Sequence, residues 1–267
     1  MNHRTVQTLL LFLLLAGTSG LLSGANDSKI VTTDGREIKT SRIEADPEGD
    51  LEYLSPDGKL KLRIARGRYR YAMIPKPAQV TAADQKFREQ QWKSAASLYQ
   101  TAAQDYKLLG WDVYCIRMEA ECLIRSGEKQ QAGELLIKLH QERETNPELA
   151  SERAMADNLL TDLLIDAKKY DEAEKLLNRQ QRREEPELAF AAHFKKAVIL
   201  QGRGDKRGAA LRFYQTALLF PNHPRRAEAL FCAWSLLTEL KAPQAASVGE
   251  MLKREYPESP YARQVFF

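Results

Sequence analysis

A pattern of small and bulky residues recurs along the C-terminal two thirds of this 267-residue chain, and it limits the possible folds more than any other feature. Each copy is anchored on an alanine, with larger side chains spaced three and four residues apart, which is the period of a helix. The anchors are Ala95, Ala132, Ala173, Ala210 and Ala245, at spacings of 37, 41, 37 and 35 residues. Repeats of this length indicate stacked helical pairs, so we expect residues 81–267 to form a helical repeat domain.

The copies resemble the tetratricopeptide repeat (TPR). The first reads Trp92-x-x-Ala95-x-x-x-Tyr99-x-x-Ala102, and the fourth and fifth end near Pro221 and Pro257. The resemblance implies about five helix-turn-helix units, in which the alanines let the paired helices approach closely and the prolines end the second helix. The fold class expected is mainly α, a TPR-type α-solenoid preceded by a small β module.

Three departures from the pattern stand out. Lys168 occupies the place of the turn glycine, and Gln180 replaces the second alanine of the third copy. The fourth copy, anchored on Ala210, needs a one-residue insertion near 202–205. A generic α-solenoid of unrelated helical hairpins therefore stays open as an alternative.

Residues 26–75 show a different period and predict a small β module. Asp34-Gly35 lies between two extended runs, which is a strong hairpin signal, and Pro56-Asp57-Gly58 marks another turn. Residues 59–64 alternate strictly, which predicts a strand with Leu60, Leu62 and Ile64 on its buried face. About five short strands are expected, resembling an SH3-like barrel. Residues 76–80, beside Pro75 and Pro77, are expected to be a linker.

Residues 1–25 have the composition of a secretory signal peptide. Arg4 is the only charged residue before Asp27, residues 9–16 are apolar, and small residues follow up to Ala25. We expect cleavage after Ala25 and a periplasmic protein beginning at Asn26. The alternative is a retained anchor, although the apolar run is shorter than the roughly 20 residues of a spanning helix.

Charge and chemistry exclude several functions. The net charge of +4, or +3 after loss of Arg4, is too small to indicate nucleic-acid binding. Cys115 and Cys122 are too far apart on one helix for a disulfide, and the three cysteines show no zinc spacing. No HExxH, P-loop, GxSxG or GxGxxG pattern is present. We expect no enzyme, no metal and no cofactor.

The resemblance places partner binding on the first helix of each repeat, whose unpacked side chains line the concave face. Arginine and asparagine there suit the backbone or carboxylate of a peptide. The expected partner-binding residues are Tyr114, Arg117, Glu121 and Arg125 in the second copy, Asn158, Asp162 and Asp166 in the third, and Lys195 in the fourth.

A second hypothesis places binding on the β module. Arg63, Arg66, Arg68 and Arg70 would form a basic face for an anionic envelope polymer or membrane surface. The repeats would then serve as a spacer or drive oligomerisation. The opposing interpretation is a solvated strand edge protected by charge.

The last repeat ends Tyr256-Pro257-Glu258-Ser259-Pro260-Tyr261-Ala262, which is similar to repeats of bacterial envelope proteins. Together with the signal peptide, this favours an exported, non-enzymatic scaffold that binds another protein of the cell envelope.

Overall fold

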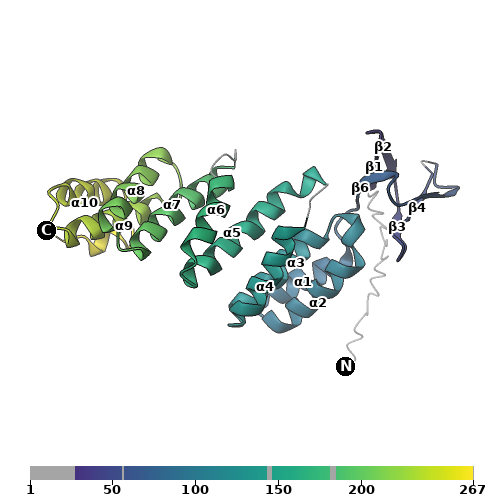
Figure 1. Ribbon diagram of the computed structural model, residues 1–267, viewed down its shortest axis with the longest axis horizontal. Coiled ribbons are helices and arrows are strands. Elements are labelled where there is room, and N and C mark those ends of the chain that lie inside the picture. Colours follow the sequence, from purple (N-terminus) through teal and green to yellow (C-terminus); the bar gives the residue numbers. More distant parts are fainter. Residues whose placement is uncertain (1–27, 56, 143–145, 181–184, 267) are drawn as a thin grey trace, which may run out of the picture.

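The computed structural model describes residues 28–55, 57–142, 146–180 and 185–266. It is an elongated molecule with the β strands at one end and helix pairs following in chain order to α10 at the other (Figure 1). Among the described residues, no helix is both long and apolar enough to cross a membrane. The expected signal peptide lies outside the described residues.

The β region contains six strands in two antiparallel sheets. One sheet has the order β2 (Glu37–Thr40), β1 (Ser28–Thr32), β6 (Tyr69–Met73), and the other β3 (Ile43–Ala45), β4 (Leu51–Leu54), β5 (Lys61–Ile64). No strand of one sheet pairs with a strand of the other in the described chain. The two sheets share one core, but a closed barrel is not shown. The expected buried face of β5 is wrong, since Leu60 and Leu62 are 61% and 37% exposed.

Ten helices follow as five antiparallel pairs in the described chain. We call the first helix of each pair an A helix and the second a B helix. The A helices are α1 (Ala78–Arg88), α3 (Asp112–Arg125), α5 (Ala150–Asp166), α7 (Pro186–Gly202) and α9 (Arg226–Glu239). The B helices are α2 (Trp92–Asp105), α4 (Lys129–Gln141), α6 (Tyr170–Gln180), α8 (Lys206–Leu219) and α10 (Gln244–Glu255). Three short 3₁₀ turns are η1 (Lys107–Leu109), η2 (Pro147–Leu149) and η3 (Ala262–Gln264). Helix α1 begins within the segment expected as a linker.

Every A helix ends in the same way. The chain takes a left-handed conformation at Gln90, Gly127, Lys168, Gly204 and Lys241. In each case the amide of the next residue donates to the carbonyl oxygen five residues before it. This is the Schellman C-cap, which satisfies carbonyls that the helix leaves free and turns the chain into the B helix.

The anchor alanines lie where the helices of a pair touch. Ala95, Ala132 and Ala173 are fully buried. In α8 the equivalent residue is Ala209, followed four residues later by buried Phe213, whereas Tyr214 is only partly buried. The fourth copy anchored on Ala210 is therefore one residue out of frame. With Ala209 as the anchor, no insertion is needed.

Contacts between repeats give the array an inner side. Helix α3 packs on α5, and α5 packs on α7, whereas no two B helices of the described chain pack to a comparable extent. When the A helices of neighbouring repeats lie closer together than the B helices do, the stack curves toward the A helices. The A helices therefore form the inner face and the B helices the outer face.

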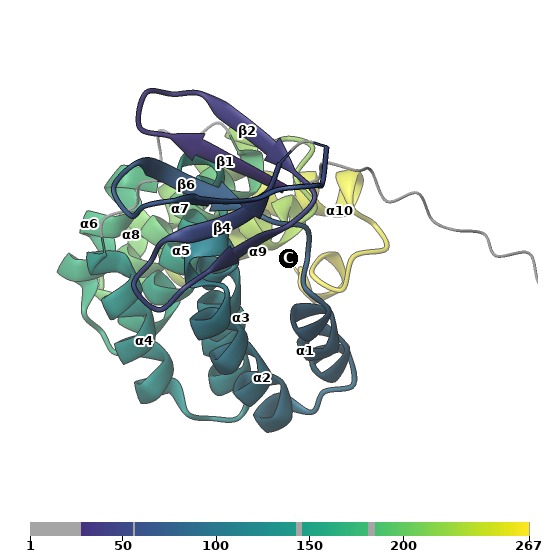
Figure 2. The same ribbon diagram turned by 90° about the vertical axis from the view of Figure 1, so that its right-hand side faces the viewer.

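The β region is packed against the first repeats (Figure 2). Leu109 of η1 joins the β core of Ile30, Ile43 and Leu51. The Trp111 indole N–H donates to the carbonyl oxygen of Ile74 over 3.0 Å, and Lys29 forms an ion pair with Glu148 of η2.

Candidate functional site

The inner face carries a row of polar and aromatic side chains that link successive A helices. The row begins at Asp84 of α1, whose Oδ1 accepts hydrogen bonds from the hydroxyls of Tyr99, over 2.6 Å, and Tyr114, over 2.8 Å. Lys76 also forms an ion pair with Asp84. Although burial opposes the effect, the hydrogen bonds from Lys76 and the two tyrosines hold the pKa of the Asp84 carboxyl below its ordinary value.

Arg117 and Glu121 continue the row on α3. The Arg117 Nε lies 2.7 Å from the Glu152 Oε2 at the start of α5, and its guanidinium lies 5.2 Å from the centre of the Tyr114 ring. Glu121 forms a 2.8 Å ion pair with Arg125 one turn further along α3. These contacts hold the α3 side chains in fixed positions.

Arg125 lies at the edge of the inner face. Its guanidinium is 5.3 Å from the ring centre of Phe87 and 5.1 Å from that of Trp92. The side chain is 47% exposed, so it can still reach an acidic group on a partner.

The centre of the row is the buried ammonium of Lys195 on α7. Its three hydrogen-bonding positions are taken by the Asn158 carbonyl oxygen at 2.7 Å, the Asn158 Oδ1 at 2.6 Å and the Asp162 Oδ1 at 2.8 Å. Burial lowers the pKa of Lys195, and Asp162 opposes that shift. Asp162 itself is 53% exposed, so its second oxygen is available on the inner face.

Arg225, just before α9, extends the row to the fifth repeat. Its guanidinium lies over two rings of α7, 4.7 Å from the centre of Phe194 and 5.7 Å from that of Phe190. The Arg225 Nε also lies 2.7 Å from the Glu228 Oε2. Hydrogen bonding to Glu228 raises the pKa of Arg225, which keeps the guanidinium charged.

A buried histidine fixes the turn that carries Arg225. The His223 ring stacks on Phe190 with ring centres 3.6 Å apart, and its Nε2 lies 2.8 Å from the Glu187 Oε2. The Arg225 amide donates to the His223 Nδ1 over 3.1 Å, which leaves the proton on Nε2. His223 therefore has a structural role here.

The structure brings most of the predicted binding residues into two groups. Tyr114, Arg117, Glu121 and Arg125 lie on α3, and Asn158, Asp162 and Lys195 meet between α5 and α7. Asp166 does not belong to the row. Its Oδ2 lies 2.6 Å from the Nζ of Lys129, at the start of the B helix α4.

Sequence reasoning missed Asp84, Glu152 and Arg225. Glu152 lies 35 residues after Arg117, and His223 lies 36 after Glu187, so each contact spans one repeat. An opposite charge one repeat away on the next A helix was the signal available for finding Glu152. Asp84 and Arg225 have no such partner among the residues described, and the sequence gives no comparable signal for them.

The four arginines of the β region do not form one basic face. Arg63 belongs to β5 and forms ion pairs with Asp46 and Asp50. Arg70 belongs to β6 in the other sheet, and its guanidinium donates to the Thr33 carbonyl oxygen over 2.9 Å. Arg66 and Arg68 lie in the turn between these strands, where the Arg66 amide donates to Asp50. Two of the four charges are therefore already engaged within the β region.

Reactive groups are scarce in the described part of the chain. It contains no group of three or more histidine, cysteine, aspartate or glutamate side chains able to hold a metal ion. Cys115 and Cys122 are buried free thiols, and burial raises the pKa of each to about 12.

Antiparallel pairs, a common left-handed cap at every A-to-B turn, and small residues at the helix contacts together define the architecture. The chain is a TPR-like helical repeat protein. No protein-family model and no curated protein sequence matches it. Among solved structures, it is similar to YrrB, described as a TPR protein with an unusual peptide-binding site, at 15% identity and a TM-score of 0.49. The match covers 69% of this chain and 88% of YrrB.

Proposed function

We propose that this protein is an exported, non-enzymatic scaffold that holds a segment of another protein on the inner face of its TPR repeats. The observation that carries the proposal is the row of charged and aromatic side chains along successive A helices. An apolar interface between α5 and α7 would be no less stable than one containing a buried ammonium. The polar row therefore supports a role in recognition.

The row is suited to binding because its side chains are already fixed. Contacts between repeats hold Lys195 and Arg117, so little side-chain freedom is lost when a partner binds. Asp162 and Arg225 retain exposed oxygen and nitrogen atoms, which can accept from and donate to an extended peptide backbone.

Export is supported by the first 25 residues, which combine Arg4, an apolar run and small residues up to Ala25. The tyrosine-proline ending of the fifth repeat favours a partner in the bacterial cell envelope. We expect N-terminal sequencing of the native protein to give Asn26 as the first residue, whereas an intact N-terminus would indicate a retained anchor.

The test is a peptide selection on the chain from Asn26 onward, which contains every described residue. A displayed peptide library is enriched on this protein, and the selected peptides are titrated by fluorescence anisotropy. We expect Asp162→Ala combined with Arg225→Ala to weaken binding by more than about 1 kcal/mol, or about fivefold.

Glu134→Ala on the outer face is the control, because in the described part of the chain the Glu134 carboxylate has a single hydrogen bond, accepted from Gln130 over 3.0 Å. Peptides that bind the double variant as well as the parent protein would contradict the proposed site. Binding that disappears steeply with salt would instead point to a charge-driven surface such as the β region.

A further inference from the structure

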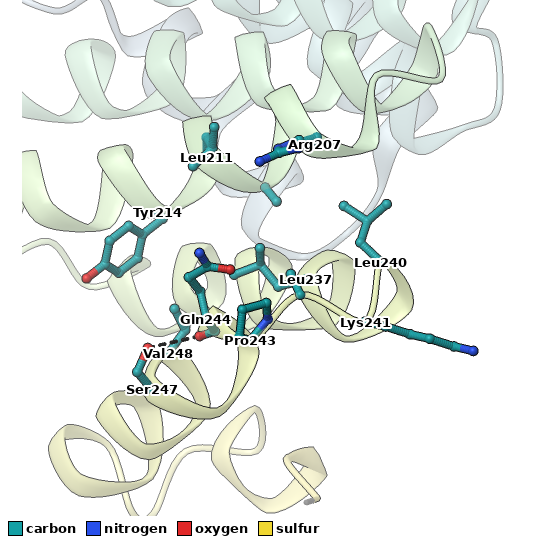
Figure 3. Close-up of a pocket in the computed structure, with 12 residues that line it drawn as sticks. Arg207, Leu211, Tyr214, Leu237, Leu240, Lys241, Pro243, Gln244, Ser247 and Val248 are labelled. Atoms are coloured by element: carbon teal, nitrogen blue, oxygen red, sulfur yellow. Dashed lines mark hydrogen bonds between the residues drawn. The ribbon is translucent and has the colours of Figure 1, made fainter.

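The outer face has a large cavity between the fourth and fifth repeats. It has a volume of about 680 Å³ and lies between α8 on one side and the C-terminal end of α9 and α10 on the other (Figure 3). Leu211 and Tyr214 of α8 face Gln244 and Val248 of α10 across it, with Leu240 at one end (Figure 3). The A-helix row described above does not contribute to it.

The first residue of the B helix explains why this groove is open. In the first and third repeats that residue is aromatic, and an arginine at the C-terminal end of the next A helix covers the ring. Arg125, the last residue of α3, lies over Trp92, and Arg203, directly after α7, lies over Tyr170. In α8 the same position is Lys206, which forms an ion pair with Glu239. In α8, therefore, no aromatic ring at the start of the B helix fills the space toward the next repeat.

Helix α8 presents an apolar stripe, of which Leu211 and Tyr214 line the groove. Leu211, Tyr214 and Leu218 are spaced three and four residues apart, so they share one helix face, and the two leucines are 53% and 49% exposed. The residues of α6 equivalent to Leu211 and Tyr214 are Lys175 and Asn178. Helix α6 therefore lacks the stripe, so the repeat itself does not demand it.

One end of the groove is positively charged. Arg207 and Lys241 both line it, and neither side chain has a hydrogen-bond or ion-pair partner within the described residues. The N-terminus of α10, which has no side-chain cap, lies at the same end and adds the positive end of its helix dipole. The α8 N-terminus is capped by the Asp205 carboxylate. No acidic side chain lines this cavity.

We propose that this groove binds an amphipathic helix of a partner protein, with its apolar stripe packed on α8 and acidic residues beside Arg207 and Lys241. Leucine and tyrosine at helical spacing match the anchors of helix-in-groove recognition. Opposite charge at one end fixes the direction of the bound helix. This surface is separate from the inner face and does not depend on the proposed function.

Charge argues against a second copy of the chain as the occupant. Two α8 stripes packed face to face would bring together the arginines and lysines that flank each stripe, with no acid among the groove residues to offset them. A partner helix with acidic residues removes that repulsion.

The experiment uses synthetic helical peptides of about 18 residues, long enough to form a helix on binding. The acidic probe carries leucines at the spacing of one helix face and glutamates in its first turn. A second probe replaces the glutamates with lysines, and a third scrambles the leucines. Each is titrated by fluorescence anisotropy against the chain from Asn26 onward.

We expect the acidic probe to bind at least tenfold more tightly than either of the others. Leu211→Glu should weaken it at least tenfold, and Arg207→Glu with Lys241→Glu should reverse the charge preference. Ile137→Glu is the matched control, since Ile137 is the residue of α4 equivalent to Tyr214 and lines the corresponding groove between the second and third repeats. That variant and the inner-face variant Asp162→Ala should bind the acidic probe unchanged.

Three results would overturn the proposal. The first is no saturable binding of the acidic probe, and the second is equal binding of the acidic and lysine probes. The third is a dimer, seen by analytical ultracentrifugation, that Leu211→Glu dissociates, since this would identify a second copy as the occupant. If Asp162→Ala loses the peptides selected for the inner face but still binds the acidic probe, the two sites are independent. Failure of one site is then distinguishable from failure of the other.

Discussion

Single residues decide how each repeat turns. All five A helices end in a left-handed residue, but only Gly127 and Gly204 are glycines. Side chains other than glycine rarely adopt this conformation without strain, so Gln90, Lys168 and Lys241 reduce the stability of their repeats. Replacement of the turn glycine by Lys168 is visible in the sequence. The repetition of the same backbone at Gln90 and Lys241 is not, because neither residue type signals it.

Lys168→Gly is therefore expected to stabilise the protein by about 0.5–1 kcal/mol, because it relieves the strain at φ 58°. Gly127→Ala, at the equivalent turn, should destabilise it by about 1 kcal/mol. Urea denaturation of the two variants measures both changes. Destabilisation by Lys168→Gly would show that the lysine side chain contributes more than the strain costs.

Glu119 on α3 is buried, and no hydrogen bond or ion pair reaches its carboxyl group within the described residues. Burial raises its pKa from 4.5 to about 7. Below pH 4.5 the group is protonated in both the folded and unfolded states. As the pH rises from about 4.5 to 7, the unfolded state ionises first, so this group's contribution to stability falls over that range.

We expect Glu119→Gln to raise the free energy of unfolding at pH 8 by about 1–2 kcal/mol relative to the parent, and to change it little at pH 4. The measurement is urea denaturation at both pH values. Glu121→Gln serves as the control, since Glu121 pairs with Arg125 and its loss should not stabilise the protein at pH 8. An equal effect of Glu119→Gln at the two pH values would contradict the assignment.

At the scale of elements, helices were predictable and strands only partly so. A period of three and four residues around alanine identifies the helix pairs, because close packing demands small residues at fixed places. The fourth pair was placed one residue late, since Ala209 and Ala210 are both small and Phe213 and Tyr214 are both aromatic. Both alanines are fully buried, and only the full burial of Phe213 against the partial burial of Tyr214 distinguishes the two frames.

The β region shows where such patterns fail. Alternation correctly located β5, but it cannot reveal whether a second layer covers the apolar face. Leu60 and Leu62 remain exposed, while the β core is completed by Leu109, which comes from beyond the first helix pair. No local pattern in residues 26–75 predicts the contact with Leu109.

The contact between the β region and η1 can be tested at Gly110. Gly110 and Gly67 both have φ 84°, but a Cβ at Gly110 would lie 2.2 Å from the Met73 Sδ, whereas nothing lies within 4 Å at Gly67. Gly67→Ala should cost about 1 kcal/mol. Gly110→Ala should cost about 2–4 kcal/mol, since overpacking is added to the same strain.

Hydrogen exchange distinguishes the two variants further. Gly110→Ala should accelerate exchange of the β1 and β6 amides, because the β region loses its support, and Gly67→Ala should not. Equal destabilisation and equal exchange in the two variants would show that the β region does not depend on this contact.

At the scale of the whole molecule, the stack presents two unlike surfaces. The inner one is a polar row, tied together by contacts one repeat apart, such as Arg117 with Glu152 and Lys195 with Asn158. The outer surface has a groove beside each B helix that begins with a lysine, namely α4 and α8. The sequence predicted which helices carry the inner row, because the repeat frame fixes it. It could not predict how these side chains pair, since pairing depends on the distance between neighbouring A helices.

Photo-crosslinking in the native cell shows whether the inner face holds a protein partner. A photoreactive amino acid is placed at position 121 or 162 on the inner face, at position 137 on the outer face as the control, and at position 68 in the β region. We expect one dominant protein adduct from positions 121 and 162 that is absent from position 137. No adduct from either inner position, with one from position 68, would contradict it and move the function to the β region.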